Sequence, residues 1–310
     1  MRALLYDRFG GPENLRVAEL PMPQAGTGEV LVRVRAATVG VGDCKARAGL
    51  LRHFHALELP KIPGRYGCGE IATVGALVEG IKVGEAVVFA TLHSESGSAA
   101  EYVRLDARRV AAKPGNLSSI ETASLIQGAV CAYFCLVEAG KVTVGCKVLV
   151  HGAAGSVGSA CIELAQHLGA EVTAICRGID RDYVTALGTG RTVAFDHEDF
   201  AAVVRDQDVV VDVIGGEVHR RSYDVLARGG RLVYLNAAPI KAKHGDRGIT
   251  AVNAVIDNRS SVLDAVCRLA EQGVFAPKLG KVLPFEQGAE AHRLVESGAI
   301  KRGRVVLEIT

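Results

Sequence analysis

The sequence predicts an α/β protein with two domains, a small antiparallel β-barrel or sandwich and a doubly wound parallel sheet. In the first third of the chain, short alternating runs at 30–36, 69–75 and 86–90 are separated by Gly and Pro, a pattern typical of antiparallel strands. From Gly145 onward, short apolar runs alternate with helix-length segments. This alternation indicates βαβ units with right-handed crossovers, and therefore a parallel sheet covered on both faces.

Composition supports a globular protein and excludes several classes. The chain has 310 residues, of which 49% are apolar and 23% charged, so disordered and fibrous proteins are excluded. The 36 basic and 34 acidic residues leave a net charge of +2, and no run of like charges predicts a nucleic-acid arm or a polybasic membrane patch. No apolar stretch is expected to approach the roughly 18 residues of a membrane span, and Asp7 interrupts any signal-peptide core. We expect a cytoplasmic protein.

The eight cysteines are scattered through apolar segments, without the spacing of a disulfide framework. This usage is typical of a reducing compartment. Cys131 and Cys135 lie one helical turn apart, and packing is their expected role.

Ser118 and Glu121 form a capping box that predicts the start of a helix, and its apolar segment runs to residue 139. The apolar run 147–151 is typical of a strand buried on both faces, and helical spacing over 156–168 predicts a helix that Gly169 ends. Further strands are expected at 171–176, 192–195, 208–214, 230–235 and 251–256. The tail, 275–310, returns to short strands and is expected to fold back onto the first domain.

The expected domains are therefore 1–117 together with 265–310, and 118–264. The second contains the segment with the clearest chemical meaning, a glycine-rich loop between the first parallel strand and its helix. A sharp turn, a close approach by a pyrophosphate and tight helix–strand packing each require a very small residue. This loop has very small residues at those three places. The start of the following helix would present backbone amides to the phosphates. The residues expected to bind a dinucleotide here are Gly152, Ala153, Ala154, Gly155, Ser156, Val157 and Gly158.

The end of the second parallel strand predicts which dinucleotide binds. A carboxylate there would bind the 2′-hydroxyl of NAD, whereas a cation can bind the 2′-phosphate of NADP. The strand ends at Cys176 and Arg177, with Arg181 four residues further on and Asp180 the only acid nearby. Guanidinium–phosphate chemistry therefore favours NADPH, with all three of Cys176, Arg177 and Arg181 at the cofactor.

With these residues in view, the chain resembles the medium-chain dehydrogenases/reductases, specifically the zinc-free NADPH:quinone oxidoreductase branch. The resemblance covers almost the whole length. It rests on the glycine loop and on segments 8–13, 29–34, 43–49, 62–64, 83–87, 100–103 and 303–307. It implies a GroES-like barrel joined to a Rossmann domain, an active site in the cleft between them, and usually a homodimer.

The same resemblance tests for zinc. Zinc enzymes of this superfamily take their catalytic ligands from positions that here carry Gly40, Arg65-Tyr66 and Gln127, so the cysteine and histidine ligands are missing. No four-cysteine lobe is present, because no cysteine lies between Cys68 and Cys131. His53 and His55 could supply two ligands at most. We therefore expect no metal site.

Without a metal, the chemistry favours conjugated acceptors. Hydride addition to an isolated carbonyl places negative charge on one oxygen, which requires a Lewis acid or a strong donor. A quinone or an α,β-unsaturated carbonyl spreads this charge, so cofactor positioning and one or two hydrogen-bond donors can suffice.

The family pattern also shows departures. The quinone reductases usually carry asparagine at the position of Gly40, threonine at that of Cys131 and a tyrosine near Leu50-Leu51. Tyr66, Arg65 and Gln127 are the candidate replacements as catalytic residues, with Tyr66 or solvent as the proton donor. Asp43 and Arg47 could form an ion pair that holds the cleft together.

Strand ends supply the remaining expected cofactor contacts. The resemblance places Cys131, Ile214 and Gly215 at the nicotinamide, and Leu235 and Asn236 follow the next strand at the crevice where strand ends converge. Residues 239–249 could form a flap or a variable loop.

Three functions are compatible with these residues. The first is an NADPH-dependent, metal-independent reductase of quinones or other conjugated carbonyls. The second is a 2-enoyl thioester reductase. The third is a weakly catalytic NADPH-binding structural or sensor protein. A small-molecule substrate is the expected partner, with neither nucleic acid nor membrane.

Overall fold

The computed structural model describes residues 1–53, 57–235 and 247–310. By internal contacts the chain divides into two units. Unit 1 comprises Met1–Gln127 and Asn258–Thr310, and unit 2 comprises Gly128–Asp257. The chain therefore enters unit 2 once, in the middle of its length, and returns to complete unit 1.

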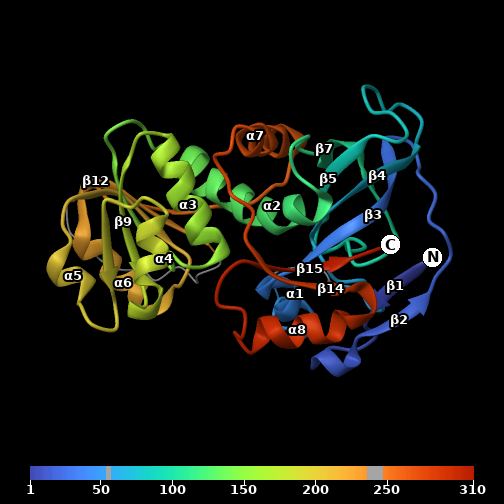
Figure 1. Ribbon diagram of the computed structural model, residues 1–310, viewed down its shortest axis with the longest axis horizontal. Coiled ribbons are helices and arrows are strands. Elements are labelled where there is room, and N and C mark those ends of the chain that lie inside the picture. Colours follow the sequence, from blue (N-terminus) through green and yellow to red (C-terminus); the bar gives the residue numbers. More distant parts are fainter. Residues whose placement is uncertain (54–56, 236–246) are drawn as a thin grey trace. The chain divides into compact units, whose positions relative to one another are not determined.

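Unit 2 contains a six-stranded, fully parallel sheet (Figure 1). Its order, β10-β9-β8-β11-β12-β13, reverses direction between β8 and β11, which is the dinucleotide-binding 3-2-1-4-5-6 arrangement. The strands are β8 (Lys147–His151), β9 (Glu171–Cys176), β10 (Arg191–Ala194), β11 (Gln207–Asp212), β12 (Leu226–Tyr234) and β13 (Thr250–Asn253). These lie where the sequence predicted strands, because each is a short apolar run bounded by turn residues.

Helices of unit 2 follow the strands as βαβ connections. They are α3 (Ser156–His167), η4 (Gly178–Asp180), α4 (Arg181–Ala186), α5 (Phe200–Val203) and α6 (Gly216–Val225). Five successive strands each contribute one side chain to a common core that also includes Phe200 and Tyr223. These are Leu149, Ile175, Val193, Val210 and Leu232. At about 25 cal/mol per Å² of buried apolar surface, such clusters supply most of the stabilisation of a sheet.

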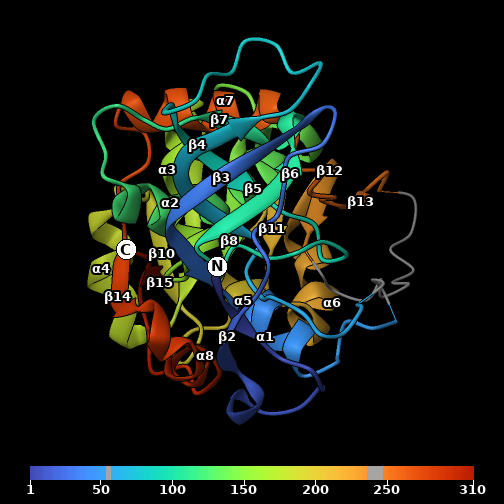
Figure 2. The same cartoon turned by 90° about the vertical axis from the view of Figure 1, so that its right-hand side faces the viewer.

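Unit 1 is built on a seven-stranded sheet of order β14-β15-β3-β4-β5-β7, with β6 paired to β3 (Figure 2). The strands are β3 (Glu29–Val39), β4 (Tyr66–Val74), β5 (Ala86–Ala90), β6 (Tyr102–Asp106), β7 (Val110–Ala112), β14 (Leu279–Pro284) and β15 (Arg304–Glu308), and β1 (Arg2–Leu5) pairs separately with β2 (Arg16–Glu19). Val30, Val32 and Val34 alternate along β3 into one buried core with Val305 and Leu307. Because β15 pairs antiparallel with β3, the tail completes this sheet, as predicted.

Short helices accompany this sheet. They are η1 (Pro12–Asn14), α1 (Val41–Arg47), η2 (Ala107–Arg109), α7 (Ser260–Glu271), η5 (Phe285–Gln287) and α8 (Gly288–Glu296). Helix α7 packs against β7 (Figure 2), and α8 packs against α1.

Helix α2 (Ser119–Tyr133) continues as a π-helical segment, η3 (Phe134–Ala139). Its capping box forms as predicted: Glu121 Oε2 accepts the Ser118 amide at 2.8 Å, and Ser118 Oγ accepts the Glu121 amide at 3.2 Å. The combined helix has 21 residues and is long and apolar enough to span a membrane by length and composition. The expectation that no apolar stretch approaches 18 residues is therefore wrong, although 72% of the tested window is buried inside the fold, as in a core helix.

Candidate functional site

The glycine loop between β8 and α3 has the tight geometry that the sequence predicts. Gly152 has a φ of +68°, which favours glycine, and its carbonyl accepts the Gly155 amide at 3.0 Å. A Cβ on Gly158 would lie 2.2 Å from the Gly152 carbonyl oxygen. The amide of Ala153 donates to Ile175 at 3.1 Å, which joins the loop to the end of β9. The loop is therefore held in a turn that only very small residues permit.

This loop forms a cradle at the start of α3, a helix of 12 residues. Gly155, at the N-cap, has no side chain that could accept a hydrogen bond from the helix. The first-turn amides of Val157 and Gly158 also have no intrahelical acceptor, as at the start of any α-helix. A Cβ on Gly128 would lie 2.5 Å from the Ser156 carbonyl oxygen, so α2 also approaches closely. An uncapped helix start behind a glycine turn fits a diphosphate, because the amides and the helix dipole both favour an anion there.

The ends of β8 and β11 meet beside this loop. A Cβ on Gly152 would lie 2.8 Å from Val213 Cγ2 and 3.2 Å from Ile214 Cδ1. Ile214 is 60% exposed, and Gly215 has a φ of +83°. Of the predicted cofactor residues, Ile214 and Gly215 therefore lie with the glycine loop, at the point where the strand order reverses.

Asp212, at the end of β11, fixes this segment. Its Oδ1 accepts the amides of Ile214 and Gly215, each at 2.8 Å, and its Oδ2 lies 2.9 Å from His219 Nδ1. Both Asp212 and His219 are buried. The Asp212 carbonyl also accepts the amide of Leu235 at 3.1 Å, which places Leu235 at the adjacent strand end. Asn236, predicted as a cofactor contact, lies outside the described residues.

The β9 end carries the predicted 2′-phosphate ligand. Cys176 is buried, and burial raises the pKa of its thiol to about 11, so its contribution would come from backbone and packing. Arg177 is exposed at the strand end, whereas Arg181 forms an ion pair with Glu198. Of the two arginines, Arg177 has its guanidinium uncommitted among the described residues. Cys131, on α2, is buried.

In unit 1, Tyr66 and Asn258 form a buried pair. The Tyr66 hydroxyl donates to Asn258 Oδ1 at 2.6 Å, and the two side chains are 1% and 0% exposed. Asn258 Nδ2 is buried without a hydrogen-bond partner among the described residues. Tyr66 lies at the start of β4, whereas Asn258 precedes α7. The hydroxyl that the sequence suggested as a proton donor therefore donates to a side-chain amide 192 residues further along the chain.

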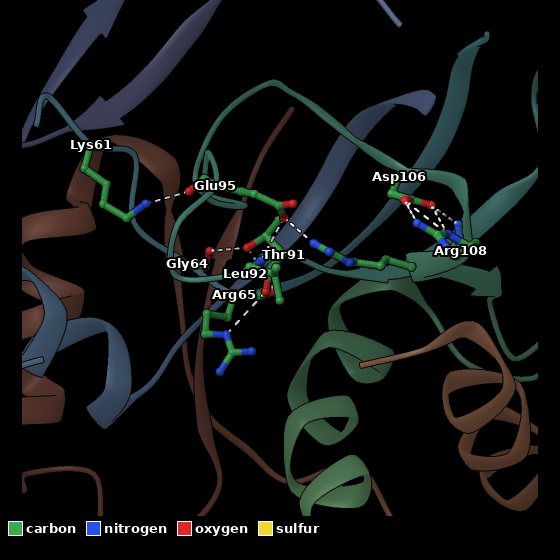
Figure 3. Close-up of polar contacts among 9 residues, drawn as sticks. Lys61, Gly64, Arg65, Thr91, Leu92, Glu95, Asp106 and Arg108 are labelled. Atoms are coloured by element: carbon green, nitrogen blue, oxygen red, sulfur yellow. Dashed lines mark hydrogen bonds and ion pairs between the residues drawn. The ribbon is translucent and has the colours of Figure 1, made fainter. Parts of the chain in front are cut away.

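The other two predicted catalytic residues lie beside different partners. Arg65 Nε donates to the Thr91 carbonyl at 3.3 Å, and its guanidinium lies over the Tyr66 ring, 5.7 Å from the centroid (Figure 3 shows Arg65 and Thr91). Gln127 Oε1 is buried without a partner among the described residues. A Cβ on Gly40 would lie 3.0 Å from that oxygen and 2.7 Å from Arg304 Nη1. The absent side chain at Gly40 thus leaves room for Gln127 and Arg304.

Asp43, on α1, lies at the centre of this region. Its Oδ2 accepts the Gly40 amide at 2.8 Å. Burial raises the pKa of Asp43, and the Gly40 amide and the guanidinium groups of Arg65 and Arg304 oppose that shift. The predicted ion pair between Asp43 and Arg47 is wrong: the buried Arg47 pairs with Glu296 on α8. An arginine without surface exposure requires a carboxylate close by, and α8 supplies it.

Sequence reasoning missed the roles of Asp212, His219, Asn258 and Arg304. Asp212 stood in a segment already associated with the nicotinamide, and Arg304 in the closing motif. Their partnerships join residues far apart in the chain or across a turn, and no local spacing indicates them. Among residues 1–53, 57–235 and 247–310, no group of three or more His, Cys, Asp or Glu side chains could hold a metal ion. His55, which the sequence suggested as a second ligand beside His53, lies outside the described residues.

Comparison with known proteins agrees with this architecture. Residues 26–139 match the family "Alcohol dehydrogenase GroES-like domain" and residues 187–307 match "Zinc-binding dehydrogenase". Among curated proteins, the chain is 29% identical over 320 residues to 2-methylene-furan-3-one reductase of Solanum lycopersicum, covering 99% of this chain and 79% of that one. It is 26% identical to the quinone oxidoreductase of Homo sapiens, covering 99% and 97%. A solved NAD-dependent alcohol dehydrogenase shares 31% identity and a TM-score of 0.91, with 100% of both chains covered.

Proposed function

The chain belongs to the medium-chain dehydrogenase/reductase family of oxidoreductases, and from that premise we propose that it is an NADPH-dependent, metal-independent reductase of quinones or other conjugated carbonyls. The family binds a nicotinamide cofactor. The glycine cradle at α3 is the observation that carries the proposal. Gly152, Gly155 and Gly158 have no side chains, so the backbone of this turn can approach a diphosphate closely.

The preference for NADPH rests on Arg177. Its exposed guanidinium at the end of β9 can bind the 2′-phosphate, while Arg181 is engaged by Glu198. The similarity to an NAD-dependent alcohol dehydrogenase makes NADH the alternative cofactor.

Metal independence is supported by the donor set. The positions of the family's zinc ligands carry Gly40, Arg65 and Gln127, none of which offers a thiolate or imidazole. An acceptor that delocalises the incoming charge then suits the site best. The names of a furanone reductase and a quinone oxidoreductase among the relatives agree with such acceptors.

The first-turn residues of α3 would hold NADPH, which would supply a hydride to the conjugated acceptor, and the reduced product would take up one proton from solvent. The protein's own residues bind and orient. The first turn of α3 holds the diphosphate, and Asp212 holds the Ile214–Gly215 segment in place. Since the Tyr66 hydrogen is donated to Asn258, we assign Tyr66 a positioning role and solvent the role of proton source.

The test is single-turnover oxidation of bound NADPH by a panel of quinones, enones and 2-enoyl thioesters. Oxidation by quinones or enones supports the proposal. Oxidation by thioesters alone would favour the 2-enoyl thioester reductase. Binding of NADPH without oxidation by any acceptor would favour a structural or sensor protein.

We also propose that the protein is a cytoplasmic homodimer with a small-molecule substrate. All eight cysteines are free thiols, as expected in a reducing compartment. Light scattering after gel filtration tests the dimer: a mass of about 33 kDa would contradict it, because one chain has 32.6 kDa.

A further inference from the structure

The guanidinium of Arg65 is held in place by neighbouring groups, but one of its edges makes no contact with them. Its Nε donates to the Thr91 carbonyl, its Nη1 lies 3.4 Å from His93 Nε2, and its plane lies over Tyr66. Thr91 is itself fixed, since its hydroxyl donates to the Gly64 carbonyl at 3.1 Å. In the described part of the chain, Nη2 of Arg65 has no partner, and Figure 3 shows the guanidinium extending away from Glu95 and Lys61. A guanidinium that is held along one edge can bind an anion such as a carboxylate with its other edge.

The neighbouring acids are already satisfied by other cations. Glu95 forms an ion pair with Arg109, and its carbonyl accepts Lys61 Nζ at 2.6 Å (Figure 3). Lys61 is 8% exposed; burial lowers its pKa, while the charges of Glu95 and Glu58 raise it. None of these acids lies within ion-pair distance of Arg65 among the described residues.

The charges of Arg65 and Arg304 both act on Asp43, where they oppose the rise in its pKa that burial causes. Arg304 approaches over Gly40, where a Cβ would lie only 2.7 Å from its Nη1. The Gly40 amide also donates to Asp43. Arg304 and this amide can therefore satisfy Asp43, which leaves the Arg65 charge for a ligand. Taken pair by pair, the four cations Lys61, Arg65, Arg109 and Arg304 interact with three carboxylates, Asp43, Glu58 and Glu95, so the cations exceed the carboxylates by one.

We propose that Arg65 binds a carboxylate group of the acceptor, so that the preferred substrates are conjugated carbonyl compounds that also carry a carboxylate. This rests on the proposed function and narrows its substrate class. A guanidinium edge matches the two oxygens of a carboxylate, and a charge-assisted pair of this kind is about twice as strong as a neutral hydrogen bond. A neutral quinone or enone would leave that edge of Arg65 to water.

The experiment compares two conjugated acceptors with the same carbon skeleton, the anion (E)-4-oxo-2-pentenoate and its neutral methyl ester. We measure kcat/KM for each by NADPH oxidation. The wild-type protein is expected to prefer the acid at least tenfold, and Arg65→Gln should lower the acid-to-ester ratio of kcat/KM at least tenfold, because only the acid loses an ion pair. Arg65→Lys keeps the charge but loses the fork, so an intermediate ratio is expected.

Arg108→Gln is the matched control. It removes one guanidinium from the same unit, but Arg108 is 87% exposed at its side chain and pairs with Asp106, so the ratio should stay at the wild-type value. A second variant tests the sharing of Asp43: Gly40→Ala should displace Arg304, draw Arg65 onto Asp43 and lower the ratio. Gly42→Ala, where an added Cβ meets nothing within 4 Å, should not.

The outcomes separate the two proposals. Reduction of the ester and of neutral quinones, with no preference for the acid, would overturn the carboxylate site and leave the proposed function standing. A preference that survives in Arg65→Gln would also overturn it. Failure to oxidise NADPH with the acid, the ester and every quinone would contradict the proposed function itself. Inhibition by the saturated acid, 4-oxopentanoate, that weakens about tenfold in Arg65→Gln would support the site independently of turnover.

Discussion

Asp212 and His219 form a buried pair, with carboxylate Oδ2 2.9 Å from imidazole Nδ1, at the point where β11 turns toward the glycine loop. The rings of Tyr223 and Tyr234 pack edge-on against His219, with centroid distances of 5.7 and 5.0 Å. Because the other carboxylate oxygen accepts the Ile214 and Gly215 amides, one buried acid connects the aromatic interior of unit 2 with the Ile214–Gly215 segment.

Replacement of Asp212 should therefore affect both stability and cofactor binding. Asp212→Ala leaves two amides and an imidazole without their acceptor, so we expect a loss of about 3 kcal/mol in the free energy of unfolding and about tenfold weaker NADPH binding. Urea unfolding and calorimetric titration measure the two effects. Asp208→Ala, on the same strand, removes one exposed hydrogen bond to Lys147 and should change neither by much. Unchanged NADPH affinity in a folded Asp212→Ala protein would remove its positioning role.

The glycine cradle predicts a severe steric effect. Gly158→Ala would place a methyl group 2.2 Å from the Gly152 carbonyl oxygen, where backbone must move, and the loop should lose its ability to bind a diphosphate. We expect at least a hundredfold increase in the Kd for NADPH and for NADH, measured by fluorescence titration. Gly190→Ala in the same unit has its nearest contact at 3.7 Å and should bind both normally.

Arg177 should determine the choice between cofactors. Arg177→Glu should weaken NADPH binding at least tenfold more than NADH binding, because the substituted carboxylate repels a 2′-phosphate and can accept a 2′-hydroxyl. Affinities for both cofactors give the comparison. Arg191→Gln serves as a control, since Arg191 donates to the carbonyl of Val203, the last residue of α5. Equal losses for NADPH and NADH would show that Arg177 does not contact the 2′-phosphate.

The Tyr66–Asn258 hydrogen bond should stabilise unit 1. Tyr66→Phe leaves Asn258 Oδ1 buried without its donor, so we expect a loss of about 1–3 kcal/mol on unfolding. If Tyr66 acts through Asn258 and solvent supplies the proton, kcat should fall only a few-fold, with its pH profile unchanged. Loss of a pH-dependent limb in Tyr66→Phe would instead identify Tyr66 as the proton donor. Tyr102→Phe, a half-buried position without a hydroxyl contact among the described residues, is the control.

Two buried histidines predict a loss of stability in mild acid. Burial lowers the pKa of His151 to about 4, and burial together with the charge of Arg47 lowers that of His292 to about 3. Because the unfolded chain binds these protons below about pH 6.5 and the folded chain does not, stability is complete above that pH and falls toward pH 4.

The free energy of unfolding should decrease by about 2–4 kcal/mol between pH 7 and pH 5, at up to about 1.4 kcal/mol per pH unit for each histidine. Urea unfolding across this range measures the slope. His292→Gln should halve it. A slope that is the same in the variant would mean that His292 titrates alike in the folded and unfolded chain.

The sequence predicted the parallel sheet well because each strand carries its own signal. Leu149 and Val150 lie in a short apolar run, and the glycines around Gly155 predict the turn that follows it. The Ser118–Glu121 cap is equally local. Side-chain partnerships across long separations carry no such signal. Arg47 pairs with Glu296 rather than Asp43 because α8 returns to α1 from the far end of the chain.

The candidate site divides in the same way. The glycine cradle at the start of α3 follows from spacing within one βαβ unit, so the residues of this turn could be named from the sequence. Tyr66 and Arg65 could be named too, but not what each one contacts. Whether a hydroxyl donates to an amide of the same unit, or a guanidinium retains an uncommitted edge, depends on packing that sequence spacing does not encode.

The pairing of β15 with β3 has a consequence for biosynthesis. All of unit 2 is synthesised before residues 304–308, and so is β3, which is made long before β15 can pair with it. The nascent chain can therefore fold its middle first, while the edge of β3 at residues 36–39 stays unpaired until β15 is made. Chaperones are most expected to bind this edge in that interval.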